Sequence, residues 1–338
     1  MKYTAALAVV IVAGLSGAAF AEPSVEILDQ AGAILEVDQP VERIASVYGL
    51  GTYYLYALGV SDRLVGAGYV GVKSVAQASE TMRRLEPRLE ELFLFGDPNV
   101  EEILRRDPQL VLADGSRHAA FSAQMNDLGI PTIQYLVESS DALLEAMRMT
   151  GLALGPDALD RAEAFVREFE RIRTTIAEAV ARLDEADCVR VLFLGTAPLQ
   201  AATGEMFQTE LIEAAGGRSV SAGLIGYWSE VNLEQILLWN PDVIVIPPYG
   251  PVQPADLLED PDWASIGAVQ VGRVHRMPRL MAPMDTPVPE SLLGILWLSS
   301  VFYPDLVSLD LRAEADRFYE RFYGLTLTEQ ELDRLTAR

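Results

Sequence analysis

The sequence predicts an α/β protein with two Rossmann-like lobes, each built on a mostly parallel sheet, joined by one long backbone helix. Short apolar, strand-like runs alternate with helix-like runs, which is the pattern of βαβ units. The stretch NVEEILRRDPQLVL at 99–112 returns as NLEQILLWNPDVIV at 232–245, so one structural step occurs twice. Between the two copies, 156–185 keeps a helical period throughout.

The first half of the chain predicts four strands with helices between them. The strand-like runs lie at 43–47, 64–67, 109–113 and 131–137, and the helix-like runs at 51–58, 100–106 and 121–128. Gly59 and Gly129 follow two of these helices, where glycine can adopt the left-handed conformation that ends a helix. Pro108 ends the remaining helix, because proline cannot continue it. We assign 22–153 to this lobe.

One helix is predicted to connect the two halves. Apolar residues recur at three- and four-residue spacing from Leu159 to Leu183, which places them on one helix face. Pro156 suits a first helical turn. About thirty helical residues span roughly 45 Å, more than one small domain. We therefore expect a linking helix within 154–187.

The second half repeats the pattern of the first. The predicted strands lie at 189–194, 243–247 and 274–277, and the predicted helices at 210–215, 232–239 and 289–302, with a helical tail beyond. We assign 188–338 to a second lobe with closing helices. In the repeated step, Asn99 and Asn232 suit the N-cap position. The pairs Ile103-Leu104 and Ile236-Leu237 are expected to face the sheet.

The chain begins with a predicted signal peptide at 1–21. A basic Lys2 precedes an apolar run at 5–20, and Ala19-Phe20-Ala21 suits cleavage before Glu22. A membrane anchor is the alternative, but the run is short for a span of ~20 residues. Cys188 is the one cysteine, so an internal disulfide is excluded. No cysteine follows the cleavage site to carry a lipid, so we expect a freely soluble exported protein.

The charge balance excludes some partners. The chain has 26 basic and 49 acidic residues, for a net charge of −23. Binding to nucleic acid or to anionic lipid needs a basic surface, so neither is an expected partner. The acidic balance suits either a positively charged partner or simple solubility.

In motif order and spacing, the mature chain resembles the substrate-binding proteins of ABC importers, in the subgroup with a rigid helical backbone. The matching motifs include Asn99-Val-Glu-Glu-Ile-Leu, Asp107-Pro-Gln-Leu-Val-Leu, Leu128-Gly-Ile-Pro131, Ala215-Gly-Gly217, Asn240-Pro-Asp-Val-Ile-Val and Tyr303-Pro304. The resemblance implies a periplasmic monomer, not an enzyme, that carries an iron–siderophore, haem or corrinoid chelate to a permease dimer in the inner membrane. By motif match, Glu101 and Glu234 are its permease-docking residues.

Ligands of open α/β lobes bind beyond the carboxyl ends of the strands, so we expect the ligand in an inter-lobe cleft. Aromatic rings suit a flat chelate, and cations suit its acidic groups. The candidates are Tyr48, Tyr53, Tyr69, Arg117, His118, Tyr227, Trp228, Tyr249 and Arg279. His118 is either a ligand of the bound metal or a supporting or surface residue. With two histidines and one cysteine, no metal cage and no resident cofactor are expected.

Two other functions have some support in the sequence. A molybdate or tungstate oxyanion is the first alternative ligand, because some proteins of this resemblance carry one and helix N-termini bind anions. The second is an NAD-dependent oxidoreductase, because Gly66-Ala-Gly-Tyr-Val-Gly71 matches G-x-G-x-x-G. That motif needs a helix beginning at its last glycine, and no helix is predicted there.

Overall fold

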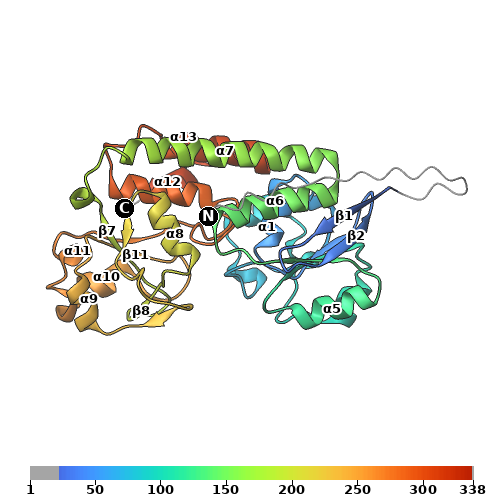
Figure 1. The fold of residues 1–338 in the computed structure, drawn as a ribbon, viewed down its shortest axis with the longest axis horizontal. Helices are drawn as coiled ribbons and strands as arrows, with labels where there is room; N and C mark the ends of the chain where they lie inside the picture. Colours follow the sequence, from blue (N-terminus) through green and yellow to red (C-terminus); the bar gives the residue numbers. More distant parts are fainter. Residues whose placement is uncertain (1–22, 337–338) are drawn as a thin grey trace, which may run out of the picture.

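The computed structural model describes residues 23–336, so the predicted signal peptide at 1–21 lies outside the described residues. Two lobes lie side by side beneath the long helix α7 (Pro156–Val180), as Figure 1 shows. Across residues 23–336, no helix is both long enough and apolar enough to cross a bilayer.

The first lobe contains a four-stranded parallel sheet in the order β4-β3-β5-β6. Its strands are β3 (Ile44–Ser46), β4 (Leu64–Ala67), β5 (Leu110–Asp114) and β6 (Thr132–Tyr135). The helices between them are α1 (Gly51–Ala57), α2 (Glu80–Leu85), α3 (Leu89–Leu92), α4 (Val100–Arg105) and α5 (Ala119–Asp127). The predicted strands and the three predicted helices of this lobe are confirmed, whereas α2 and α3 were not predicted.

The second lobe contains a four-stranded parallel sheet in the order β12-β11-β7-β9. Its strands are β7 (Arg190–Phe193), β9 (Arg218–Ser219), β11 (Val243–Ile246) and β12 (Val274–Arg276), and its helices are α8 (Phe207–Ala214), α9 (Leu233–Trp239), α10 (Pro254–Leu258) and α11 (Gly267–Gln270). When the four strands of each sheet are numbered by their order along the chain, both sheets have the same spatial order: second, first, third and fourth strand. The two lobes therefore share one topology.

The repeated sequence is one structural step in both lobes. The side chain of Asn99 accepts a hydrogen bond from the Glu102 N–H at 3.0 Å, and that of Asn232 accepts one from the Gln235 N–H at 2.8 Å. Both predicted N-caps are confirmed. Asp107 and Asn240, which precede the two prolines, have left-handed φ values of 51° and 41°, a conformation that Asp and Asn tolerate better than most residues.

One detail of the repeat prediction is wrong. Ile103 and Ile236 are buried as expected, but Leu104 and Leu237 are 39% and 37% exposed. Helices α4 and α9 are short and turn only one narrow face to the sheet, so the residue after the buried isoleucine points partly to solvent.

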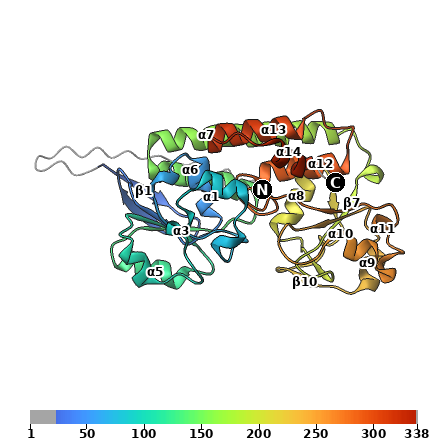
Figure 2. The same cartoon turned by 180° about the vertical axis from the view of Figure 1, so that it is seen from behind.

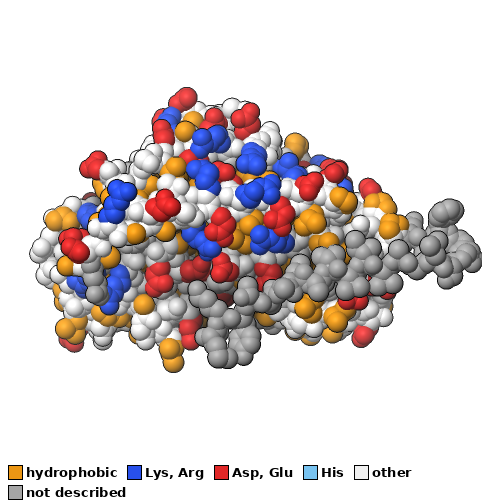
Figure 3. Space-filling model, turned by 45° about the horizontal axis from the view of Figure 1, so that its top comes forward, with side chains coloured by type: hydrophobic (Ala, Val, Ile, Leu, Met, Phe, Trp, Pro, Cys, Tyr) orange, Lys and Arg blue, Asp and Glu red, His pale blue; other side chains and the backbone are white. Residues whose placement is uncertain are grey.

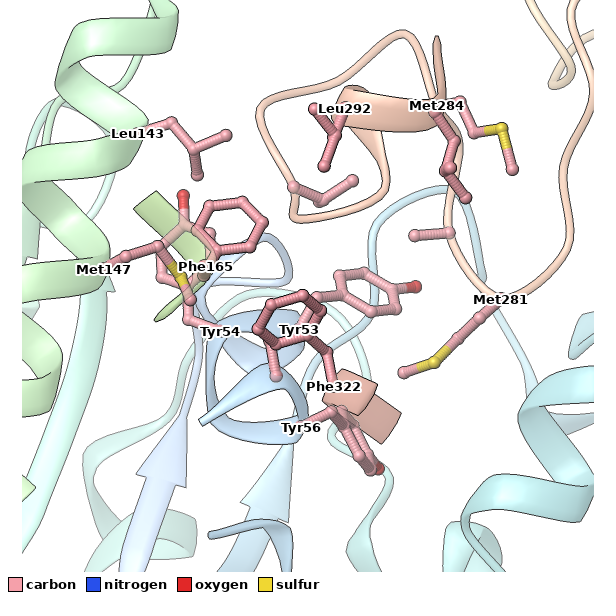
Figure 4. Close-up of a cluster of buried hydrophobic side chains, with 14 of the residues drawn as sticks. Tyr53, Tyr54, Tyr56, Leu143, Met147, Phe165, Met281, Met284, Leu292 and Phe322 are labelled. Carbon is pink, nitrogen blue, oxygen red and sulfur yellow. The ribbon is translucent and has the colours of Figure 1, made fainter. Parts of the chain in front are cut away.

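Helix α7 ends at Val180, five residues before the predicted end, and its 25 residues span roughly 37 Å. Its buried face includes Phe165, Phe169 and Ile176. These residues belong to one continuous core that contains strand residues of both sheets, such as Ile44 and Val243. Figure 4 shows Phe165 among Tyr54, Met147 and Phe322, which come from three other segments. The linking helix is therefore packed into both lobes, which opposes bending at the junction.

The sequence did not predict α6 (Ser140–Leu154), although α6 packs against α7. Gly155 separates these two helices with a φ of 106°. Also unpredicted are the hairpins β1 (Ser24–Leu28)/β2 (Ile34–Asp38) and β8 (Gln200–Ala201)/β10 (Ser229–Glu230) and the short 3-10 turns Ser61–Arg63, Val75–Gln77, Glu185–Asp187 and Pro261–Trp263.

The C-terminal helices reach back to the first lobe. They are α12 (Ser291–Phe302), α13 (Leu311–Phe318), the π-helical turn Tyr319–Tyr323 and α14 (Glu329–Thr336). Helix α13 lies beside α7 (Figure 2). On α14, Glu331 forms an ion pair with Arg84 at 2.5 Å and accepts a hydrogen bond from Thr81 at 2.6 Å. The C-terminal segment that we assigned to the second lobe therefore also contacts helix α2 of the first lobe.

The outer face of α7 and α13 carries interspersed charges of both signs (Figure 3). Arg171 of α7 contacts Glu168 at 2.7 Å and Glu314 of α13 at 2.6 Å. Arg173 contacts Asp141 of α6 at 2.9 Å. These pairs join α7 to helices on both of its sides and add to the packing beneath.

Replacing Phe169 by Ala is expected to lower the free energy of unfolding by about 3–5 kcal/mol, because the ring is fully buried on the inner face of α7. Urea unfolding followed by circular dichroism measures the change. Arg167→Ala, on the exposed side of the same helix, is the matched control and should change stability by less than about 0.5 kcal/mol. Equal effects of the two substitutions would contradict the packing described for α7.

Candidate ligand site between the lobes

The strand order places the loops expected to bind ligand at the facing ends of both sheets. In this topology the crevice opens between the first and third strands of each sheet. The loops at that point are 47–50 and 115–118 in the first lobe, and 194–199 and 247–251 in the second. At Gly49, an added Cβ would lie 2.7 Å from the Val70 backbone nitrogen, so only glycine permits the loops after β3 and β4 to approach this closely.

The first lobe contributes a stacked tyrosine pair and a charged turn. The ring of Tyr48 stacks on Tyr135 with centroids 5.5 Å apart, and Tyr48 is 5% exposed. Asp114 ends β5 and contacts the exposed Arg117 at 3.3 Å. His118 accepts a hydrogen bond from the Asp114 N–H through Nδ1 at 3.2 Å. Burial lowers the pKa of His118, which favours a neutral ring with Nε2 available.

The second lobe brings aromatic residues to the same boundary. Tyr227 is 63% exposed, and the charges of Glu138 and Arg117 in the first lobe lie close enough to influence its pKa, which burial raises. The ring of Trp228 is 6.5 Å from that of Phe193 at the end of β7. The Tyr249 hydroxyl donates a hydrogen bond to Asp285 Oδ2 at 2.6 Å.

Arg279 crosses between the lobes and has unused hydrogen-bond donors. Its Nη1 donates to the Gly71 carbonyl of the first lobe at 3.1 Å. Its Nε and Nη2 are buried, and within residues 23–336 they have no hydrogen-bond partner; the same holds for the Tyr53 hydroxyl and Asp285 Oδ1. Arg279 is close enough to influence the pKa of both Tyr53 and Asp285. Buried donors without partners are costly, and an anion placed here would accept from Arg279 and Tyr53, although not from Asp285 Oδ1, which is itself an acceptor.

Tyr53 and Tyr69 do not form an open aromatic wall, in contrast to the expectation from sequence. Tyr53 is 0% and Tyr69 6% exposed, and the two rings meet edge to face at 6.1 Å. The Tyr69 hydroxyl is hydrogen-bonded to that of Tyr56 at 3.0 Å. All seven residues of α1 are buried, so its tyrosine rings serve mainly as core. Only the Tyr53 hydroxyl points to a role at the boundary.

Sequence reasoning did not single out Asp285 or Glu138. Both follow strands of the sheets but are separated from Tyr249 and Tyr227 by 36 and 89 residues in sequence, so only the folded chain brings them together. The one sequence signal was the position of Asp285 in the segment between the last strand and the closing helix.

Asp285 gives the protein a predictable pH dependence. Burial raises its pKa to about 6, and the hydrogen bond from Tyr249 offsets part of that effect. In the unfolded chain its pKa is about 3.9. Between pH ~4 and ~6 the folded protein therefore binds the proton more tightly, and this contribution to stability is lost as pH rises through that window.

Asp285→Asn is thus expected to flatten the stability profile between pH 4.5 and 7 and to stabilise the protein at pH 7 by about 1–3 kcal/mol. Urea unfolding at both pH values measures this. Asp127→Asn, on the exposed side of α5, is the control and should leave the profile unchanged. If the free energy of unfolding of Asp285→Asn depended on pH as that of the parent protein does, Asp285 would not be the source of the pH dependence.

A dinucleotide site is not supported by the structure. Strand β4 ends at Ala67, inside the glycine motif, and the chain from Gly68 to Ser74 contains no helix. The pyrophosphate of a dinucleotide would have no helix N-terminus to bind. Within residues 23–336 there is also no group of three His, Cys, Asp or Glu side chains that could hold a bare metal ion.

The two glutamates of the repeat have equivalent positions. Glu101 and Glu234 are exposed in the first turns of α4 and α9. Each helix precedes the third strand of its sheet. Two related lobes fixed to one helix thus present the same acidic side chain on each half of the molecule.

Two lobes of equal topology, a packed linking helix and polar groups between facing strand ends define a solute-binding protein of the kind that encloses its ligand between lobes. The family of periplasmic binding proteins matches residues 44–279, and the chain belongs to this family.

The known relatives differ in the solutes that their names carry. The molybdate-binding protein MolA of Haemophilus influenzae is 25% identical over 275 residues, which cover 73% of this chain and 77% of that protein. The vitamin B12-binding protein of Yersinia pestis is 28% identical over 209 residues, which cover 62% of this chain and 70% of that protein. These relatives are solute-binding proteins.

Solved structures share the fold over nearly the whole chain. A periplasmic solute-binding protein from Veillonella parvula has a TM-score of 0.81 at 24% identity and covers 93% of this chain and 97% of its own. MolA bound to molybdate has a TM-score of 0.78 at 22% identity and covers 90% of this chain and 99% of its own. The two-lobed fold expected from the sequence is therefore confirmed.

Proposed function

We propose that this protein captures an anionic, metal-containing solute between its lobes and delivers it to an ABC importer, without catalysing a reaction. The observation that carries the anionic character is Arg279, whose Nε and Nη2 are buried at the lobe boundary without partners among the described residues. A guanidinium binds carboxylate, phosphate or oxyanion oxygens through paired hydrogen bonds. Arg117 lies at the same boundary and adds a second cation.

The first candidate ligand is a metal chelate with acidic groups, such as an iron–siderophore, haem or corrinoid. Tyr227 and Trp228 supply apolar rings beside the cations, and a relative in the same family is named for binding vitamin B12. The chelate brings its own ligands for the metal, so no resident cofactor is required. His118 is proposed to contact the bound molecule through Nε2.

The second candidate is a small oxyanion such as molybdate or tungstate. The lobes approach closely enough for Arg279 to donate to Gly71, which suits a compact ligand better than a large one. The relative MolA, named for molybdate, covers most of the chain. Tyr53 and Arg279 then supply donors around the oxyanion.

The remaining partner is the permease. We propose export with cleavage before Glu22, a monomeric periplasmic protein, and docking of Glu101 and Glu234 onto basic residues of a permease dimer. Two separated charge contacts on a rigid body orient the complex even when each exposed pair contributes only ~0–1 kcal/mol.

A binding panel tests the proposed function. Isothermal titration of the mature protein with molybdate, tungstate, cyanocobalamin, haemin and a ferric siderophore is expected to give saturable 1:1 binding for one class. Molybdate or tungstate binding selects the second candidate, and a chelate selects the first. Turnover of NADH or another substrate without saturable binding would contradict a carrier function.

A further inference from the structure

The two lobes are joined by a carboxylate contact at the N-terminus of helix α6. Glu210, in the first turn of α8 in the second lobe, accepts from the backbone N–H of Ser140 in the first lobe. The Ser140 nitrogen is 2.9 Å from Oε1 and 2.8 Å from Oε2. Ser140 is the first residue of α6, so its N–H has no acceptor within the helix.

The contact lies where both lobes meet the linking helix. Arg173 of α7 and Asp141 of α6 face the Glu210 carboxylate and influence its pKa. In the opposite direction, Glu138 of the first lobe lies at the N–H of Phe207, the first residue of α8. Each lobe thus presents a carboxylate to a helix N-terminus of the other, and anionic groups are favoured there. Glu138 is exposed, so Glu210 is the stronger of the two contacts.

We infer that Glu210 is a positioning residue that holds the lobes at the separation needed for ligand binding. The contact is close to α7, whereas α5 and α10 lie on the sides of the lobes away from α7 (Figure 1). A small rotation at the contact therefore becomes a larger displacement at those helices. The inference rests on the proposed function in one respect: it takes the separation of the two lobes to affect ligand binding.

The chemistry of the contact predicts which substitutions preserve it. Burial raises the pKa of Glu210, and the hydrogen bond from Ser140 offsets part of this effect. A neutral acceptor of the same shape avoids the desolvation of a charge, so Glu210→Gln should retain the contact. Glu210→Ala removes the acceptor and leaves the Ser140 N–H unpaired.

Ser140→Pro tests the same contact from the first lobe, because it removes the backbone N–H that donates to Glu210. Proline is well tolerated at the first position of a helix, and Ser139 already has the extended conformation that precedes proline (φ −147°, ψ 159°). The Ser140 hydroxyl also lies close enough to the Glu210 carboxylate to lower its pKa, so Ser140→Pro removes this interaction together with the N–H donor.

The test measures the lobe-to-lobe distance in ligand-free protein, which keeps it independent of ligand identity. Spin labels are placed at Asp127→Cys in α5 and at Glu259→Cys beside α10, in a Cys188→Ser background, and their distance distribution is recorded by double electron–electron resonance. Asp127 and Glu259 are both exposed. Thermal melting followed by circular dichroism checks that each variant is folded.

Glu210→Ala and Ser140→Pro are both expected to shift the distribution to longer distances and to broaden it. Glu210→Gln and the matched control Glu213→Ala, which lies on the exposed side of the same helix, should keep the parent distribution. The inference is overturned if Glu210→Ala and Ser140→Pro superimpose on Glu213→Ala. It is also overturned if Glu210→Gln opens the lobes as far as Glu210→Ala. A failure of the ligand panel with a positive distance result would reject the proposed cargo and leave this contact standing.

Discussion

Joint replacement of Glu101 and Glu234 by Ala is expected to abolish ligand uptake by cells while leaving ligand affinity unchanged. The two carboxylates are exposed on equivalent helices of the two lobes. In the proposed complex each ion pair with the permease is weak alone, but the second pair forms once the first has oriented the two proteins. The loss of both carboxylates therefore removes the contacts that orient the protein on the permease as well as their binding energy.

Uptake of radiolabelled or metal-quantified ligand, measured in a host lacking the chromosomal copy, reads out this effect. Each single replacement should reduce uptake partially. Glu90→Ala with Glu259→Ala removes the same charge from exposed positions on the two lobes and should transport normally. Normal uptake by the Glu101/Glu234 double variant, at equal protein level, would reject the docking assignment.

Arg279→Ala is expected to weaken ligand binding by roughly 30- to 100-fold. Charge-assisted hydrogen bonds to a buried guanidinium contribute about 2–3 kcal/mol, and each 1.4 kcal/mol is a factor of ten in affinity. Arg279→Lys should restore binding only in part, because an ammonium lacks the planar pair of donors. Isothermal titration with the ligand selected by the panel measures both variants.

The substitution removes one existing hydrogen bond, from Nη1 to Gly71, so the fold should survive, and thermal melting checks this. Arg167→Ala, on the exposed side of α7, removes the same charge from a solvent-facing position and should bind normally. Unchanged affinity in Arg279→Ala would show that the unpaired donors serve another purpose.

The strands and lobes could be predicted because their signals are local. Residues 109–113 and 243–247 are apolar runs that follow Asp-Pro and Asn-Pro breaks, and at those breaks Asp107 and Asn240 adopt left-handed φ values. Helix α6 escaped prediction because only Gly155 separates it from α7, so its pattern merges with that of its neighbour. The two-residue strands β8 and β10 have too few residues to show any period.

The site could be predicted only in part, because burial and inter-lobe contacts depend on distant segments. The sequence of α1 is rich in tyrosine, and nothing local shows that α7 and the C-terminal turn Tyr319–Tyr323 cover it completely. Tyr53 was therefore expected at a surface that the fold fills. Arg279 was foreseen as a cation at a strand end, but its hydrogen bond across the lobe boundary is to Gly71, which lies 208 residues earlier.

The central claim is that an anionic, metal-containing solute is held between the lobes by Arg279. Native mass spectrometry with elemental analysis of protein purified from the periplasm of its own host tests this most directly. One equivalent of a molybdenum-, tungsten-, iron- or cobalt-containing adduct is expected on the parent protein, with strong depletion in Arg279→Ala. A metal-free mass for the parent protein after saturation with host extract, or an adduct retained in full by Arg279→Ala, would contradict it.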